Sequence, residues 1–351
     1  MSDVMTRPAP QEPWKVADPT ATAQQIVTHL GTPLLAALIT VLSPVSGYSG
    51  FFVVWLPVHI VTAALLGRFG HRRKDFANST LEVLMGAAVV VFGTFVASVL
   101  WPVISNGVAG FEWNLLTQDA SQAEVDAPLT VGGMGHAILG SLIIVGGATA
   151  ISVPIGILAA LYVTEVRGRL TPFVRFFVQA MSGVPSIVAG LFVYAALVVS
   201  GLLEFSGLAG AVALSILMLP TVARTAEEIL RLVPDDLRTA ALALGGTQWR
   251  VVRMVVLPAA RSGLITAAIL GIARVAGETA PLLLTAFGNT AFNTNPVSDS
   301  MSALPLYVFS QMLLGGDNDV ARAWVACLVL LVIVGVLFTT ARVVANKMKQ
   351  A

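Results

Sequence analysis

Charged side chains are scarce in this sequence. Asp, Glu, Lys and Arg together make up 11% of its 351 residues, hydrophobic residues make up 56%, and the mean hydropathy is +0.84. Soluble globular domains carry about 25% charged residues. The scarcity of charge therefore excludes an ordinary soluble globule and indicates a polytopic membrane protein. The net charge of +1 gives no indication of nucleic-acid binding.

The sequence also lacks cysteine pairs, histidine clusters and nucleotide-binding motifs. The single cysteine, Cys327, lies inside an apolar run, which excludes a disulfide framework and a thiolate metal site. The four histidines are scattered, no nucleophile–base pair is visible, and the phosphate-binding pattern G-x-x-x-x-G-K-[ST] does not occur. We therefore expect no catalytic residue, no metal and no bound cofactor in this chain.

Long apolar runs, by contrast, fill most of the chain. A helix needs about 20 apolar residues to cross a hydrocarbon core of ~30 Å. We assign eight runs as spans: 27–43, 49–67, 78–103, 135–163, 172–203, 207–231, 259–287 and 322–345. The expected fold is an all-α, polytopic membrane helix bundle. Its expected parts are a disordered cytosolic tail (1–26), a transmembrane hairpin with a basic loop (27–75) and a six-span transmembrane domain (76–351).

The distribution of basic residues predicts the orientation. The connections 104–134 and 288–321 contain acids but no Lys or Arg, and the connections on the other side collect the basic residues. Because Lys and Arg concentrate in cytoplasmic loops, we expect both termini and the polar stretch 233–258 in the cytosol.

The polar stretch 233–258, called here the 233–258 insert, predicts two short helices between two spans. Asp235 is placed to cap the first helix and Gly245 to end it in a left-handed conformation. Thr247 is placed to cap the second helix, and Pro258 to end it. One apolar stripe follows the helical spacing of the first helix: Leu237, Ala240, Ala241 and Leu244.

The spacing within the insert resembles the EAA loop of ABC importer permeases, E-A-A, three residues, G, nine residues, I-x-L-P. TAALALG, nine residues and VVLP fit this pattern at Ala240, Ala241, Gly245, Leu257 and Pro258, and depart from it at two positions. Thr239 stands where Glu is usual, and Val255 where Ile is usual. The resemblance implies a type I ABC importer permease core of six transmembrane helices, preceded here by the two-helix hairpin. It also implies a coupling helix that binds a separate ATPase.

Three charged residues lie in or near the predicted membrane interior. Arg274 lies inside the span 259–287, and Glu278 follows one turn later on the same predicted helical face. A charge in lipid is costly, and such charges either line a transport pathway or form buried ion pairs. The alternative to a pathway role for Arg274 and Glu278 is therefore a structural ion pair that joins two helices. Arg224 follows a short apolar run, and its alternative is to extend to the cytosolic interface.

Prolines interrupt four predicted spans, at Pro154, Pro185, Pro220 and Pro281. Each proline removes a backbone hydrogen bond, and such breaks gather around cavities in transporters. Structural kinks alone would explain one or two of these prolines, so the presence of four favours a transport pathway.

Three strings resemble the phosphate-specific, PstA-type branch of these permeases: GVPSIVAGLFVY (183–194), LPTVARTAEEIL (219–230) and ARVAGETAPLLLTAF (273–287). The resemblance covers roughly residues 78–345 and implies that Arg224, Arg274 and Glu278 take part in anion passage. Guanidinium groups suit phosphate oxygens. Our hypothesis is that Glu278 neutralises Arg274 until phosphate competes for it.

The same resemblance implies partners. These are a PstC-type permease in a heterodimer, two PstB-type ATPase subunits that hydrolyse ATP with Mg, and a PstS-type phosphate-binding protein on the outer face. Segment 302–314 is placed either at that outer face or against the bundle. Three alternatives stay open: a permease for sulfate, molybdate or an amino-acid carboxylate, an ion-coupled secondary transporter, and a signalling component of a phosphate-sensing complex.

Overall fold

The computed structural model describes residues 30–42, 51, 54–55, 57–62 and 73–350. These residues are helical or lie in connections, and their β structure is limited to one isolated bridge between Phe287 and Met301. The chain divides into two compact units, 1–100 and 101–351, which are described separately. The predicted tail (1–26) lies outside the described residues.

The first unit contains part of the predicted hairpin. Helix α2 covers Thr32–Leu42 and is 11 residues long, shorter than the span expected at 27–43. Thr32 Oγ1 lies 2.6 Å from Nδ1 of His59, and both residues are buried, so the two predicted runs contact each other. The connection 43–50 and the loop 63–72 lie outside the described residues.

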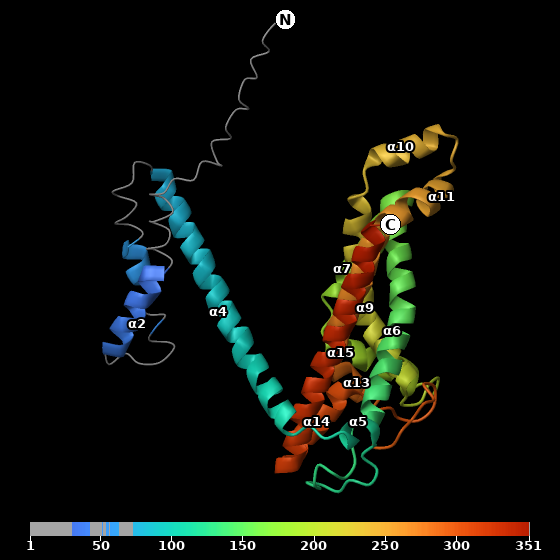
Figure 1. Cartoon of the computed structure of the whole chain (residues 1–351). Helices are drawn as coiled ribbons and strands as arrows, with labels where there is room; N and C mark the ends of the chain where they lie inside the picture. The colour runs from blue at the N-terminus through green and yellow to red at the C-terminus, as the bar shows by residue number, and fades with distance from the viewer. Residues whose placement is uncertain (1–29, 43–50, 52–53, 56, 63–72, 351) are drawn as a thin grey trace, which may run out of the picture. The chain divides into compact units, whose positions relative to one another are not determined.

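Six candidate spans follow the predicted hairpin: five lie in the second unit (Figure 1), and the first, Ala88–Ala109, lies mainly in the first unit. Five helices are long and apolar enough to cross a membrane, and a bent pair forms a sixth span. The straight spans are Ala88–Ala109 of α4 (Arg73–Ala109), α6 (Gly135–Leu161) with its π turn η2 (Tyr162–Val166), α9 (Gly207–Arg231), Gln248–Val275, and Asp317–Thr340 of α15 (Asp317–Gln350). The predicted six-helix core is confirmed, although its first span starts and ends later than 78–103.

The span predicted at 172–203 is bent. Helix α7 (Thr171–Ser182) and helix α8 (Ser186–Val193), which continues as η3 (Tyr194–Val198), meet at 106°. Pro185 takes the position before α8 with extended backbone (ψ 141°). A proline also disfavours helical backbone in the residue before it, so Val184 cannot continue α7. The predicted interruption of this span at Pro185 is confirmed, and the structure adds the size of the bend.

The span predicted at 259–287 differs at both ends. It begins at Gln248, because α11 (Gln248–Val251), the π turn η4 (Val252–Val256) and α12 (Leu257–Val275) form one continuous helix. Pro258 therefore does not end the second helix of the insert, since it lies just after the π turn η4, which already interrupts the α-helical hydrogen-bond pattern at this point. At the other end, α12 stops at Val275 and Pro281 begins the short helix α13 (Ala280–Thr285).

Helix α9 lies at the centre of the core. Its buried residues Leu214, Met218 and Val222 pack in one cluster with Ile144 of α6 and Leu282 of α13. Glycines on the neighbouring helices permit close approach: a Cβ at Gly156 would lie 2.9 Å from Val222, and one at Gly271 would lie 2.6 Å from Val222. Ser206 caps the start of α9 by accepting a hydrogen bond from Ala209 N at 3.3 Å.

The elements of the second unit gather at two ends (Figure 1). Helices α10 (Asp235–Ala243) and α11 lie at one end, here the α10 end, and α5 (Asn114–Thr117) and α14 (Leu304–Leu314) lie at the opposite, α14 end. Helix α14 covers most of segment 302–314. It is buried from Leu304 to Tyr307 and exposed at Phe309 and Leu313, so it both packs on the bundle and faces outward.

Candidate functional site

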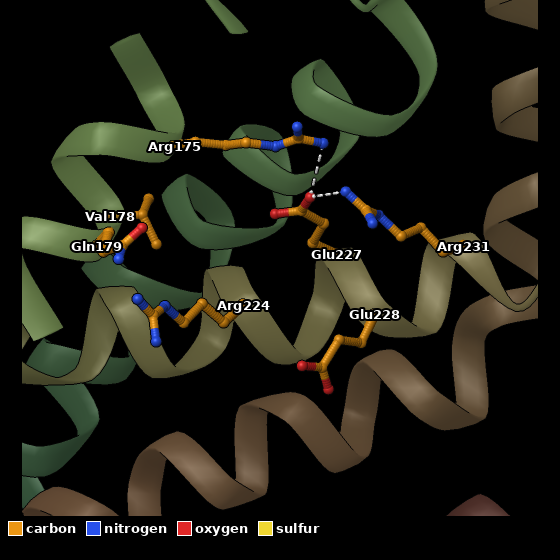
Figure 2. A pocket seen from close by; sticks show the side chains of 7 residues that line it. All are labelled: Arg175, Val178, Gln179, Arg224, Glu227, Glu228 and Arg231. Carbon is orange, nitrogen blue, oxygen red and sulfur yellow. Dashed lines mark hydrogen bonds and ion pairs between the residues drawn. The ribbon is translucent and has the colours of Figure 1, made fainter. Parts of the chain in front are cut away.

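A cationic cavity of about 400 Å³ opens between α7 and α9 toward the α10 end (Figure 2). Its lining combines three arginines with two glutamates and two further side chains: Arg175, Val178, Gln179, Arg224, Glu227, Glu228 and Arg231. Helix α7 contributes the first three and α9 the other four. The charged groups sum to +1, so the cavity favours an anion.

One carboxylate holds two of these arginines. Oε1 of Glu227 lies 3.0 Å from Arg175 Nη2 and 2.5 Å from Arg231 Nη2, which joins α7 to α9. The side chains of Arg175 and Arg231 are 48% and 57% exposed, and that of Glu227 is 19% exposed. Water screens such pairs, and each contributes on the order of 0–1 kcal/mol to stability.

Arg224 is the third arginine of the cavity and differs from the other two. It is exposed and forms no ion pair or side-chain hydrogen bond with any residue that the structure describes. Figure 2 shows its guanidinium directed toward Gln179 and Val178, while Glu227 and Glu228 project from opposite sides of α9. The Arg224 guanidinium therefore has its donors available for an incoming anion.

Arg274 and Glu278 do not share a helical face, contrary to the prediction. Arg274 lies in the last turn of α12 and is exposed, whereas Glu278 is half-buried in the break between α12 and α13. Within the described chain the two side chains form no ion pair. The helix ends because Pro281 has no N–H to donate and its ring would clash with the carbonyl of Gly277. The hypothesis that Glu278 neutralises Arg274 thus lacks the contact it requires in this structure.

The two arginines predicted to take part in anion passage, Arg224 and Arg274, lie at different heights in the bundle. Gly271 packs against Met218 and Val222 of α9. Arg274 follows Gly271 toward the α14 end, whereas Arg224 follows Val222 toward the α10 end. The 400 Å³ cavity contains Arg224 but neither Arg274 nor Glu278.

Helices α8 and α13, which each follow a break in a predicted span, contact each other. A Cβ at Gly190 of α8 would lie 2.6 Å from the Cα of Pro281 in α13, so only glycine allows this approach. This contact holds the middle of α8 against the start of α13, just after the break that contains Glu278. Of the four prolines predicted inside spans, Pro154 and Pro220 lie within helices, and Pro185 and Pro281 lie at helix starts.

The 233–258 insert forms the two predicted helices. Gly245 has φ +82° after the end of α10, and Thr247 caps α11 by accepting from Arg250 N at 3.4 Å, as expected. Asp235 is the first residue of α10 rather than its cap, because Pro234 takes the cap position. Thr239, at the place of the usual Glu, donates to the carbonyl of Asp235 at 3.0 Å.

The insert exposes apolar side chains. The exposed fractions are 45% for Leu237, 90% for Leu244 and 66% for Trp249. Ala240 is also exposed and Ala241 is half-buried, so most of the predicted stripe faces away from the bundle. Large apolar side chains exposed on α10, which lies outside the membrane spans, are typical of a surface that binds another protein.

Arg238 joins the insert to the bundle, a role that the sequence analysis missed. Its Nε and Nη2 donate to the two carboxylate oxygens of Glu165 at 3.2 and 2.9 Å. The hydrogen bond to Glu165 raises the pKa of Arg238 above its ordinary value. Glu165 lies 73 residues earlier, at the end of η2, so no local pattern could relate the two.

The geometry excludes some chemistry for the described part of the chain. Nowhere in it do three or more His, Cys, Asp or Glu side chains gather so that they could hold a metal ion. What the described residues present instead is interrupted membrane helices, an arginine with available donors and an exposed insert. These features are typical of membrane transport proteins.

Comparison with known proteins places the chain within this class. Residues 152–350 match the family described as "Binding-protein-dependent transport system inner membrane component". The chain belongs to this family of permeases.

Similar proteins cover most of the chain. It is 40% identical to the phosphate transport system permease protein PstA of Haemophilus influenzae, over 71% of this chain and 88% of that protein. It is 37% identical to PstA of Yersinia pestis, over 79% of this chain and 95% of that protein. Among solved structures, the inward-facing MetNI methionine ABC transporter matches with a TM-score of 0.49 and 18% identity, over 62% of this chain and 94% of that chain.

Proposed function

We propose that this chain is a permease subunit of an ATP-driven phosphate importer in the bacterial plasma membrane. The observation that carries the proposal is its similarity to relatives named as PstA permeases of phosphate transport systems, which extends over 88–95% of their length. The chain would form half of the anion pathway together with a PstC-type permease.

The arginines provide the chemistry that phosphate requires. Phosphate carries one to two negative charges, and guanidinium groups bind its oxygens with two parallel hydrogen bonds. Arg224 and Arg274 are both exposed and, within the described chain, unpaired, so they can contact an anion in turn at two heights of the bundle. Glu278, half-buried in the break near Arg274, would limit how long the anion stays.

The exposed apolar face of α10 and α11 supports an ATPase partner. In this proposal two PstB-type subunits hydrolyse ATP with Mg, one of them binds the 233–258 insert through that face, and this chain itself holds no cofactor. A PstS-type phosphate-binding protein would bind the α14 end. This assignment requires the α10 end to be cytosolic.

Exposed charges support that orientation. The α10 end displays the exposed arginines Arg167, Arg169, Arg175, Arg224 and Arg231. The α14 end displays the exposed acids Glu112, Glu124, Asp126, Asp299 and Asp317. The positive-inside rule then places the α10 end and the C-terminus in the cytosol.

The test is uptake of radiolabelled phosphate into proteoliposomes that contain this chain with its partner permease, ATPase and binding protein. We expect uptake to require ATP and to resist competition by sulfate and molybdate. Arg224→Gln and Arg274→Gln should each lower the uptake rate about tenfold or more, because each removes a charged hydrogen-bond donor worth ~1.5–3 kcal/mol. Arg224→Lys and Arg274→Lys should keep part of it.

The other outcomes separate the alternatives. Uptake without ATP would indicate an ion-coupled secondary transporter. Competition by sulfate or molybdate would indicate a permease for another anion. Full uptake by both glutamine variants would keep the importer function but exclude the two arginines from the pathway.

A further inference from the structure

Helix α10 is held to the membrane helices mainly through one side chain. None of the residues of α10 is buried, yet the side chain of Arg238 is only 15% exposed, because it folds back from α10 toward the bundle. Besides the two bonds to Glu165, it donates to the carbonyls of Leu230 at 2.8 Å and Val233 at 2.5 Å, and to Asp235 at 3.0 Å. All five bonds converge on a single guanidinium.

The Glu165 carboxylate needs this partner. Its side chain is 7% exposed, and it lies in the last turn of the span Gly135–Val166. A negative charge at a helix C-terminus is unfavourable, and a buried carboxylate is costly when it is unpaired. The Nε and Nη2 groups of Arg238 donate to both carboxylate oxygens of Glu165. The backbone carbonyl of Glu165 also accepts a bond from the side-chain amide of Gln248, so both helices of the insert are tied to this residue.

The carbonyls that Arg238 binds belong to the end of α9. Leu230 and Val233 lie in the last turn of α9 and in the corner that follows it, where backbone carbonyls lack partners within the helix. One turn earlier, α9 carries Glu227 and then Arg224, which line the cavity. A displacement of α10 would therefore reach α6 through Glu165, and α9 with its cavity through these carbonyls.

We propose that the Arg238–Glu165 ion pair transmits movement of the 233–258 insert to α6 and α9, with Arg238 as the positioning residue. This inference rests on the proposed function, since the insert moves only if an ATPase binds it. The exposed face of α10 that would bind the ATPase, at Leu237 and Leu244, is separate from the buried guanidinium. Docking and transmission can thus be separated by mutation.

The experiment uses the complete importer in proteoliposomes. The variants are Arg238→Gln, Arg238→Lys, Glu165→Gln and the double variant Arg238→Gln/Glu165→Gln. The matched control is Arg169→Gln, which removes an exposed arginine at the same end that forms no ion pair or side-chain hydrogen bond with any described residue. For each complex we would measure co-purification of the ATPase, basal ATP hydrolysis, thermal stability, and phosphate imported per ATP hydrolysed.

We expect Arg238→Gln and Glu165→Gln each to lower phosphate imported per ATP about tenfold, a size typical of coupling between sites. Co-purification and basal hydrolysis should stay at the level of the Arg169→Gln control. Arg238→Lys should recover part of the yield, because a lysine keeps the charge but not the fork. The double variant should be no worse than Arg238→Gln alone, because both changes remove the same interaction.

Two results would overturn the inference. One is an unchanged yield per ATP in both single variants. The other is a fall in yield that merely follows a parallel loss of thermal stability and ATPase co-purification, because the pair would then only hold the fold together. A wild-type complex that imports no phosphate with ATP would instead contradict the proposed function.

Discussion

Arg322 is a charged residue that is buried beside an acidic partner and two backbone carbonyls, although its Nε has no hydrogen-bond partner among the described residues. It lies near the start of α15 and is 2% exposed, as is the side chain of Asp319, with which it pairs at 3.4 Å. Its Nη2 donates to the carbonyls of Pro128 at 2.9 Å and Val131 at 2.8 Å, and Asp319 accepts from Asp126 N at 3.1 Å. The pair thus fixes the 110–134 connection on α15.

Arg322→Met should therefore destabilise the protein. It leaves the carboxylate of Asp319 buried without its cation, which costs about 3–5 kcal/mol of unfolding free energy. Thermal unfolding of the purified protein in detergent measures this loss. The double variant Arg322→Met/Asp319→Asn should recover part of it, and Asp317→Asn, at an exposed position of the same helix, should change stability by less than about 0.5 kcal/mol. An Arg322→Met protein as stable as the control would contradict the role assigned to the pair.

At the scale of elements, the broken helices depend on close backbone contact. Helices α8 and α13 are too short to span a membrane alone, and they meet where Gly190 faces Pro281. The backbone N–H and C=O groups that lack helical partners at the two breaks stay away from lipid only while this contact holds. The position is therefore sensitive to one added methyl group.

Gly190→Ala should cost about 1–3 kcal/mol, because its Cβ would approach the Cα of Pro281 to 2.6 Å. Gly146→Ala is the matched control: it lies inside α6, and a Cβ there has nothing within 4 Å. Because alanine favours helix over glycine, this control should be neutral or gain up to about 1 kcal/mol. Comparing the thermal unfolding of both variants with the wild type tests the contact. Equal behaviour of the two variants would show that α8 and α13 do not need glycine at this point.

The 233–258 insert divides its apolar residues between the core, where Val251 and Val256 are buried, and an exposed face at Leu237 and Leu244, which we propose binds the ATPase. We expect Leu237→Ser and Leu244→Ser to abolish co-purification of the ATPase from detergent extracts, because they remove exposed apolar area from the proposed contact. The thermal stability of the permease itself should change by less than about 0.5 kcal/mol, since both side chains are exposed.

The control for these two variants is Asp236→Asn, which changes an exposed side chain of α10 outside the apolar stripe. It should leave co-purification intact. An ATPase that stays bound to both serine variants would place the docking surface elsewhere.

At the scale of the whole molecule, the separation of charge between the two ends predicts a single orientation. In a Cys327→Ala background, Thr294→Cys should react with a membrane-impermeant maleimide in right-side-out vesicles. Arg169→Cys should react only after the membrane is permeabilised. Both positions are exposed and lie at opposite ends of the second unit. The reverse labelling pattern would invert the proposed orientation and place the insert out of reach of cytosolic ATP.

The pairings of charged groups were the least predictable features. Arg238 meets Glu165, and Arg175 meets Glu227, over 73 and 52 residues of chain. Arg274 and Glu278, only four residues apart and expected to pair, are separated by the end of a helix. Sequence distance is a poor guide to ion pairs, because packing decides which helix ends meet.

The sequence by itself determined the class of protein, the six-span core and the two-helix insert. These depend on local properties: apolar runs long enough to cross a membrane, the left-handed backbone at Gly245 and the cap at Thr247. The sequence also predicted interruptions at four prolines, but only the tertiary structure decided which of them break a helix and which charges meet. It bent the chain before Pro185, carried the helix past Pro258 and stopped it before Pro281, because a proline's effect depends on whether a π turn or a neighbouring helix accommodates it.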